Sequence, residues 1–391
     1  MFDDIKKSVG AILSEIGIKD KFDFTLVISG TELPVVSGRL KRSIDTCADG
    51  CKATIALTDQ ARDVIRPFGF EDVQVYLGGE LVLTGVVYGL NLRITGKEKS
   101  ATLDIGSLAC DIVDSTKYPP YEFNFQTLAD IADDILGEKG LTPRFESYDI
   151  ESEFFERVCI DAQQSIFDFL SELARQRGVL ISSNEKGEVY FLRADTSSNP
   201  VETIELATSL EGSFNGRNLF SSYRVTAMLP EVQARTKVLK RSGPRTTYRT
   251  IQTLKFAEAY DSLVPSTRET TTTVDNVTSE GLPKAAEWER SRRWAKACTI
   301  TIPRIGWYPK DNDELYKENT LVTLKISDLW LEDGFDFLIK SVEYVLDSNG
   351  AVALITLIPP QAYTGEPIPD IFGGSVALNI SLKSLGLPDG F

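Results

Sequence analysis

The chain has 391 residues, of which 42% are hydrophobic and 25% are charged, so it is neither a disordered chain nor a disulfide scaffold and should fold into several domains. Its net charge of −15 disfavours a protein that reads duplex DNA, because such proteins bind phosphates through Lys and Arg. The sequence has no histidine, which removes the usual general base, the partner of a nucleophilic Ser or Cys, and the commonest zinc, iron and copper ligand. Enzymes are therefore a disfavoured class.

The sequence carries no signal for membrane insertion or secretion. No apolar run is long enough to span a bilayer, and Asp3 and Asp4 stand where a signal peptide would be basic. We expect a protein that is made and kept in a cytoplasm. The cysteines are odd in number and scattered, which predicts reduced thiols that serve as packing residues: Cys47, Cys51, Cys110, Cys159 and Cys298.

The first part of the chain changes from helical to strand periodicity. Residues 1–21 predict an N-terminal amphipathic helix, which either packs on its own domain or docks on a partner, because apolar residues recur at helical spacing from Ile5 to Ile16. From 22 to 117 apolar residues alternate with polar ones, and turns such as Gly78-Gly79 separate the runs. This pattern predicts a small antiparallel β-barrel, barrel 1.

Residues 118–196 predict an α+β domain. Two apolar helical stripes, over 128–136 and 166–174, superpose at an offset of 38 residues, and Gly140 then falls on Gly178. This is a local pseudo-repeat of a helix followed by a strand. A hairpin with its turn at 184–187 follows the second helix.

The rest of the chain predicts a second barrel, an insertion and a tail. Barrel 2 takes residues 197–232 and 285–363, the polar, Thr-rich and basic residues 233–284 form an insertion within it, and residues 364–391 form a C-terminal tail. The strands that start near Cys298 and Gly334 resemble those near Cys51 and Gly79, which indicates either a duplication or two unrelated barrels with similar patterning. The predicted fold class is mainly β with α+β parts: two similar small antiparallel β-barrels, an α+β domain and an insertion domain.

No residue set predicts a catalytic, cofactor-binding or metal site. The carboxylate pairs Asp133-Asp134 and Glu332-Asp333 are adjacent, and adjacent residues on a helix do not share a face. Ser183 and Lys186 match a bare Ser-x-x-Lys spacing but lie at a predicted hairpin tip, where a polar turn is the simpler interpretation. Cys47 and Cys51 have no second ligand pair, so they do not predict a zinc site.

Two segments are candidates for binding. The run from Arg235 to Arg249 has six positive residues and no acid, so it either contacts an acidic neighbour or a passing nucleic acid, or is a solvated loop. Trp288 and Trp294 lie among Glu and Arg residues on a predicted helix over 285–296, nearly opposite each other. We expect one indole to pack and the other to be covered by Arg side chains.

The C-terminal third of the sequence resembles a known family. The similar features are a helix that ends with residues 292–297, the strand residues 299–302 after it, the Gly306-Trp307 turn, residues 315–322, and the stretch from Phe337 to Tyr363. Together they are similar to Mu-type bacteriophage baseplate hub proteins, within a superfamily that includes phage late control protein D and the N-terminal part of type VI secretion spike proteins. The Gly79 strand pair and the unit that ends at Gly178 extend the resemblance over most of residues 20–363.

The resemblance implies a structural baseplate hub of a contractile phage tail rather than an enzyme, and it implies no cofactor. Such hubs are homotrimers in which two barrels per chain form a pseudo-sixfold ring that joins the hexameric tail tube to the trimeric central spike. The implied partners are the spike, the tail tube or tube-initiator protein, baseplate wedge proteins and the tape-measure protein. DNA would pass the lumen without sequence-specific binding, no stable membrane association is expected, and the acidic surface would repel DNA.

The implied location is the virion tail baseplate, with assembly in the bacterial host cytoplasm. The tail at 364–391 has alternating apolar residues at 376–382 and is expected to add a strand to a partner's sheet. Two alternatives remain: a hub or spike-base component of a related contractile injection system, and a tail-associated cell-wall hydrolase, which would need a carboxylate or metal cleft.

Overall fold

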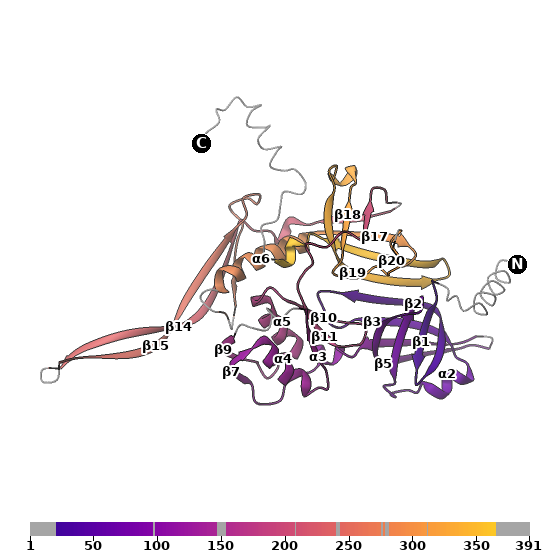
Figure 1. The fold of residues 1–391 in the computed structure, drawn as a ribbon, viewed down its shortest axis with the longest axis horizontal. Coiled ribbons are helices and arrows are strands. Elements are labelled where there is room, and N and C mark those ends of the chain that lie inside the picture. Colours follow the sequence, from indigo (N-terminus) through magenta and orange to yellow (C-terminus); the bar gives the residue numbers. More distant parts are fainter. Residues whose placement is uncertain are drawn as a thin grey trace, which may run out of the picture.

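The computed structural model describes residues 21–96, 98–146, 154–207, 209–239, 243–274, 277, 281–310 and 312–364. The predicted N-terminal helix and nearly all of the predicted C-terminal tail lie outside these residues. The molecule is elongated: two β-barrels occupy one end and a long two-stranded arm projects from the other, and the α+β domain lies between them (Figure 1).

Barrel 1 is a closed six-stranded antiparallel barrel with the order β1-β4-β5-β6-β3-β2, and β2 pairs back with β1. Alternate residues point inward and are buried, as the period of two predicts. Helix α2 (Asp59–Val64) connects β3 to β4. The strands are β1 (Phe24–Ile28), β2 (Thr31–Ser43), β3 (Gly50–Ala56), β4 (Asp72–Leu77), β5 (Glu80–Ile94) and β6 (Lys99–Ser107).

Barrel 2 repeats this order as β12-β18-β19-β20-β17-β13, so its strands occupy the same places in the same chain order. Within the described residues β12 and β13 are not paired, and this barrel is therefore open at one seam. The predicted mainly β fold with two similar barrels is confirmed, but barrel 2 is not fully antiparallel: β12 pairs with β18 in parallel, whereas the equivalent strands β1 and β4 are antiparallel. The strands are β12 (Glu202–Ile204), β13 (Glu211–Phe214), β17 (Cys298–Ile305), β18 (Leu321–Leu324), β19 (Phe335–Asp347) and β20 (Gly350–Ile358).

The two barrels share one sheet and one core. Residues 38–43 of β2 pair antiparallel with residues 341–346 of β19, which joins both barrels into a 12-stranded sheet. Trp307, in the connection between β17 and β18, is fully buried, and its ring meets Phe24 of barrel 1 edge to face at 6.2 Å. The barrels therefore form one rigid unit.

The α+β domain contains the predicted pseudo-repeat. Thr127 caps helix α4 through a capping box, and Ser165 caps α5 through its hydroxyl. Both helices end before a glycine with positive φ, Gly140 and Gly178, where a side chain would be strained. The elements are α3 (Cys110–Asp114), β7 (Glu122–Thr127), α4 (Leu128–Gly137), β8 (Pro143–Phe145), β9 (Phe154–Cys159), α5 (Ile166–Gln176), β10 (Leu180–Ser183) and β11 (Val189–Leu192).

Two predicted domain boundaries and one cysteine prediction need correction. The three-stranded insertion sheet already begins at Ser222, not at 233, because the strand predicted near Leu219 to Met228 pairs with the insertion and not with barrel 2; periodicity identifies a strand but not its partner. Helix α3 packs in the core of the α+β domain, which therefore begins before residue 118. Cys159 is exposed and is not a packing residue.

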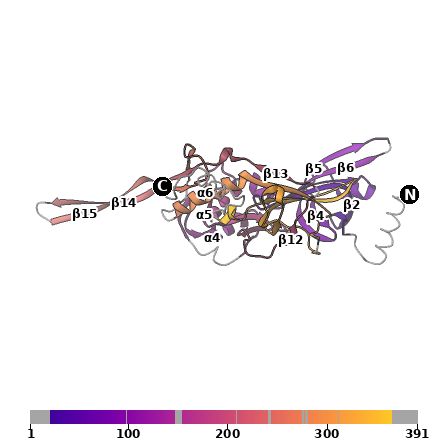
Figure 2. The same cartoon turned by 90° about the horizontal axis from the view of Figure 1, so that it is seen from above.

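The insertion forms the arm seen at the left of Figure 1, and Figure 2 shows it again from above. A helix then leads back from the insertion sheet to barrel 2, and a short helix follows the last barrel strand. The elements are β14 (Ser222–Leu239), β15 (Gly243–Tyr260), β16 (Glu269–Thr273), α6 (Gly281–Ala297) and α7 (Gln361–Thr364).

Candidate interaction surfaces

A buried arginine holds three parts of the chain together. Arg42 of β2 lies 2.7 Å from a carboxylate oxygen of Glu318, which precedes β18, and 3.3 Å from Asp49, which precedes β3. Its Nη2 also donates to the carbonyl of Ser183 in the α+β domain at 3.0 Å. Because these side chains are almost fully buried, the cluster fixes the angle between both barrels and the α+β domain.

Asp49 makes this cluster sensitive to pH. Burial raises the pKa of Asp49 from its ordinary 3.8 to about 7, and the nearby charge of Glu318 adds to the increase. Between these values the folded chain holds a proton that the unfolded chain releases, so folding stability should fall as the pH rises through this window.

We therefore expect Asp49→Asn to flatten the pH dependence of stability. The Ser43 amide and the Ser183 hydroxyl donate to different carboxylate oxygens, at 3.2 and 3.0 Å. In the Asn variant the amide oxygen can still accept from Ser43, and the amide NH2 group can donate to the Ser183 hydroxyl oxygen. Urea unfolding between pH 5 and 8 measures the slope, which is at most about 1.4 kcal/mol per pH unit for one group. An Asn variant with the slope of the parent chain would contradict the assignment.

The second half of β5 has an unpaired edge. Strand β4 pairs with β5 only up to Val86, and beyond a register shift after Val87 the strand pairs with β6 alone among the described residues. This half forms part of a ribbon that projects from barrel 1 (Figure 2). It exposes the apolar side chains of Tyr88, Leu92 and Ile94, which are 43%, 50% and 64% accessible. An exposed apolar strand edge is suited to pairing with another strand.

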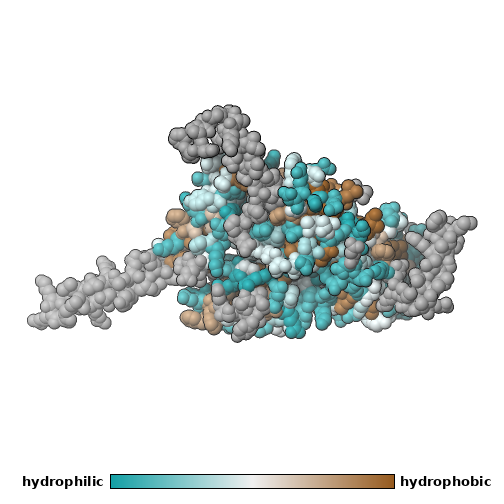
Figure 3. All heavy atoms as spheres, turned by 45° about the horizontal axis from the view of Figure 1, so that its top comes forward, coloured by the Kyte–Doolittle hydropathy of each residue, from teal (hydrophilic) through white to brown (hydrophobic). Residues whose placement is uncertain are grey.

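The second unpaired edge belongs to β13. Within the described residues this strand pairs only with β17, on one side. Beside it lies a largely apolar cavity of about 500 Å³. Over the barrel end of the molecule, Figure 3 shows hydrophobic residues scattered among polar ones. An edge next to an apolar hollow is typical of a protein interface. The hollow is lined by Phe214, Asn215, Gly216, Leu219, Trp294, Ala297, Cys298 and Trp330.

The structure does not bring the candidate polar groups of the sequence together. The two carboxylate pairs are exposed and lie apart in the fold. Asp133 and Asp134 belong to α4, whereas Glu332 and Asp333 lie in the loop before β19. Ser183 is buried, and its hydroxyl donates to Asp49, so it is not part of a polar turn as predicted. Cys47 and Cys51 are both buried free thiols. No group of three or more Cys, Asp or Glu side chains that could hold a metal occurs in the described part of the chain.

The two tryptophans of α6 both pack. Trp294 lies against the joint core of the barrels, and Trp288 lies against a smaller cluster that includes Leu180 and Tyr363. Trp288 also lines a pocket together with Arg175 and Arg292, as the expectation of nearby Arg side chains requires. The basic run from 235 to 249 lies in the β14 and β15 hairpin, where the strands pair from Ser222 to Tyr260.

None of the described helices is long and apolar enough to cross a membrane. Sequence reasoning did not find the Arg42 cluster, because its members are far apart in the chain and each stands in an ordinary polar context. The unpaired edges were also not predictable, since they depend on which strands pair.

Two segments match family models of phage baseplate proteins. Residues 278–366 match the model described as "Mu phage baseplate assembly protein GpP, fourth domain", and residues 109–193 match "Baseplate hub protein gp44-like, second domain". The first covers α6 and most of barrel 2, and the second covers the α+β domain from α3 onward. Both matched segments are thus similar to domains of phage tail baseplate proteins.

Individual relatives support this class. Baseplate hub protein gp44 of Escherichia phage Mu is 27% identical over 299 residues, which cover 73% of this chain and 74% of that protein. The resemblance to the Mu-type hubs is thus confirmed: two segments of the chain and most of its length are similar to baseplate hub proteins of Mu-like phage tails.

Two solved structures share the fold. The 43 kDa tail protein of prophage MuSo2 from Shewanella oneidensis is 24% identical, with a TM-score of 0.69 over 88% of this chain and 99% of that one. A tail protein from Neisseria meningitidis is 16% identical, with a TM-score of 0.72 over 88% of this chain and 99% of that one. These likenesses establish the fold over most of the described chain.

Proposed function

We propose that three copies of this chain form a closed ring of six barrels, and that the ring joins a sixfold tail tube to a threefold central spike. One observation carries the proposal. Within one chain the two barrels meet where β2 pairs with β19, and the unpaired edges lie on the equivalent strands of the other barrel: β13 is equivalent to β2, and β5 is equivalent to β19. The contact between chains would then repeat the contact within a chain.

The equivalence rests first on the strand order. β2 and β13 are the second strands of their barrels, and each pairs with the third strand, β3 or β17. β5 and β19 are the fifth strands, and each pairs with the fourth and the sixth. Within the chain β2 pairs with β19, so between chains β13 is the counterpart of β2 and β5 is the counterpart of β19.

A register shift makes the equivalence more specific. It occurs in β5 between Val87 and Gly89, and in β19 between Ile339 and Ser341. After the shift in β19, residues 341–346 pair with β2 of the other barrel. After the shift in β5, residues 89–94 have no partner on that side within the described chain. The second half of β5 therefore offers the same kind of edge.

The side chains at the two edges are complementary. The second half of β5 carries the exposed apolar side chains of Leu92 and Ile94. Strand β13 lies beside the apolar hollow that is lined in part by Trp330. A contact that joins two different surfaces is head to tail, and it closes into a ring when the rotation between copies is a simple fraction of a turn. Three chains with two barrels each give threefold symmetry and pseudo-sixfold symmetry together.

The ring architecture supports the remaining parts of the proposed function. Six similar barrels can face the tail tube or tube-initiator protein, whereas the α+β domain and the arm, present once per barrel pair, can face the trimeric spike and the baseplate wedge proteins. DNA, and the tape-measure protein before it, would pass through the lumen. The net charge of −15 favours passage of DNA without sequence-specific binding. Assembly would take place in the host cytoplasm.

The role is proposed to be structural and not enzymatic, since the matched relatives are named as baseplate hub and tail proteins. A hub or spike-base role in a related contractile injection system remains the alternative, because such a protein would use the same barrels and edges. A cell-wall hydrolase has no positive observation in its favour.

The first experiment is the native mass of the purified chain, alone and together with its spike protein. We expect a species of three times the chain mass of 43.3 kDa in at least one of the two samples, measured by light scattering after gel filtration. A strict monomer in both samples would overturn the ring.

A further inference from the structure

A small pocket lies where four parts of the chain meet, and the proposed ring does not use it. Its walls come from α5 and β10 of the α+β domain, from the β2 to β3 connection of barrel 1, from α6, and from β19, β20 and α7 at the end of barrel 2. The cavity volume is about 130 Å³. Since about 10–15 Å³ suffices for one water by this measure, the pocket has room for a small polyatomic ion.

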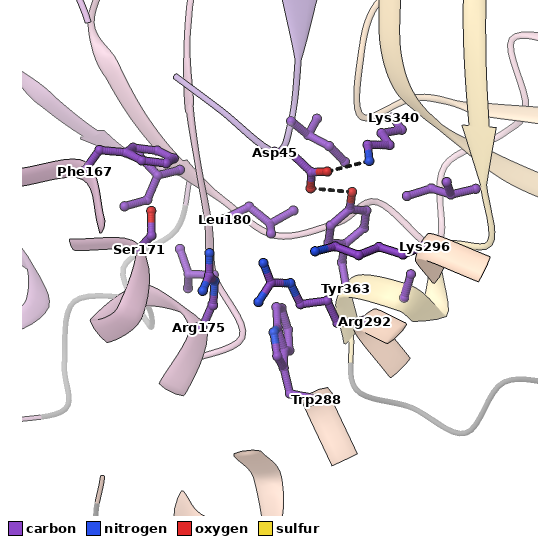
Figure 4. A pocket seen from close by; sticks show the side chains of 15 residues that line it. Asp45, Phe167, Ser171, Arg175, Leu180, Trp288, Arg292, Lys296, Lys340 and Tyr363 are labelled. Atoms are coloured by element: carbon purple, nitrogen blue, oxygen red, sulfur yellow. Dashed lines mark hydrogen bonds and ion pairs between the residues drawn. The ribbon is translucent and has the colours of Figure 1, made fainter. Parts of the chain in front are cut away.

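The pocket carries an excess of positive charge within an acidic protein. Four cations line it, Arg175, Arg292, Lys296 and Lys340, against the single carboxylate of Asp45 (Figure 4). Asp45 is already engaged: Lys340 lies 2.7 Å from it, and the Tyr363 hydroxyl donates to it at 2.7 Å.

The remaining three cations have no such partner. Within the described residues, no carboxylate lies in ion-pair contact with Arg175, Arg292 or Lys296. Burial lowers the pKa of Lys296 and of Arg175, and the positive charge of Arg292 lowers both further. Arg175 and Lys296 are exposed and Arg292 is half-buried, so the three cations repel each other at the mouth of the pocket, and an anion between them would relieve this repulsion.

A buried neutral donor points to the same conclusion. Trp288 lines the pocket, and Figure 4 shows its ring close to Arg175 and Arg292. Its Nε1 is shielded from solvent, and in the described part of the chain no acceptor lies within hydrogen-bond distance of it. An indole N–H buried without an acceptor carries a free-energy cost. An oxyanion in the pocket could accept from it.

We propose that this pocket is a binding site for a tetrahedral oxyanion of the phosphate class, held by the guanidinium groups of Arg175 and Arg292, the ammonium of Lys296 and the indole N–H of Trp288. Arginine and lysine are the side chains that recognise phosphate through charge-assisted hydrogen bonds. The ligand would cross-link the α+β domain, helix α6 and the two barrels. A neighbouring groove, lined in part by Arg177, Arg193 and Lys284, shares Arg175 and Trp288 with the pocket and gives the anion a positively charged approach.

The test is thermal unfolding of the full chain in sodium chloride buffer with increasing inorganic phosphate at constant ionic strength. A ligand that binds only the folded state raises the melting temperature, and we expect a saturable rise of about 2–4 °C. Arg292→Gln should abolish the rise. The same variant should be at least as stable as the parent chain without phosphate, because it removes repulsion from Arg175 and Lys296.

The matched control is Arg66→Gln, which removes the same charge from an exposed side chain of barrel 1 and should keep the full phosphate response. Isothermal titration of the parent chain with phosphate should give one site per chain, and Lys296→Gln should weaken it. A rise that does not saturate, or that is equal in Arg292→Gln and Arg66→Gln, would show a general salt effect and overturn the proposal. The test is independent of oligomeric state, so its failure would leave the proposed ring intact.

Discussion

Leu92→Pro is expected to convert the proposed trimer into monomers while the chain stays folded. The register of the β5 and β6 hairpin explains why this position is informative. Thr95 donates its amide hydrogen to the carbonyl of Glu98 across the hairpin at 2.8 Å, so Arg93 and Asn91 also direct their amides toward β6. Leu90, Leu92 and Ile94 then direct theirs outward, to the edge that we assign to the neighbouring chain.

Proline at position 92 removes one outward amide and leaves the bonds to β6 in place. A closed ring of three chains would lose one hydrogen bond between chains at each of its three interfaces. Each acceptor left without a donor costs about 1–3 kcal/mol of association free energy. Light scattering after gel filtration measures the mass, and circular dichroism with thermal unfolding shows whether the barrel persists.

Leu92→Thr is the matched control, because it removes the same exposed apolar side chain, has a good strand propensity and keeps the amide. It should weaken the trimer far less than proline does. A Leu92→Pro chain that is folded and still trimeric would show that this edge does not form the interface.

Arg42→Met is expected to have the largest effect on folding stability. The substitution leaves Asp49 and Glu318 buried without their cation, and removing one partner of a buried ion pair costs about 3–5 kcal/mol. Urea unfolding at pH 7.5 measures the loss. Part of it should be recovered at pH 5, because protonation of a carboxyl removes the uncompensated charge.

Arg39→Met on the same strand provides the control. Arg39 lies 3.1 Å from Glu343 of β19, but its side chain is 62% exposed, and exposed pairs contribute about 1 kcal/mol or less. Equal losses for the two variants would show that the buried cluster has no special role at the junction.

Much of the fold was predictable from local patterns. The period of two identified the strands of both barrels, and the stripes at 128–136 and 166–174 identified α4 and α5 with their glycine ends. The similarity of the segments after Cys51 and Cys298 indicated the repeat, because strands in equivalent places bury the same alternate positions.

The surfaces were less predictable, since they depend on contacts between residues far apart in sequence. Arg42, Glu318 and Ser183 meet only because β2 pairs with β19 and the α+β domain packs against both. Nothing near Arg292 or Lys296 in the sequence indicates that α5 brings Arg175 to the same pocket. For the same reason, the pattern near Leu219 to Met228 predicted a strand but assigned it to the wrong sheet.

The connection between the second and third strands is where the two barrels differ most. In barrel 1 it is the short segment from Ile44 to Asp49, whereas in barrel 2 it runs from Asn215 to Ala297 and contains the arm. Lengthening of this connection in barrel 2 leaves the strand order of both barrels unchanged. Gene duplication followed by divergence at this single loop is therefore sufficient to make the two barrels of one chain distinct. In the proposed ring it would turn six equivalent positions into three pairs, and later changes in the arm could adapt the protein to a new partner without changing the barrels.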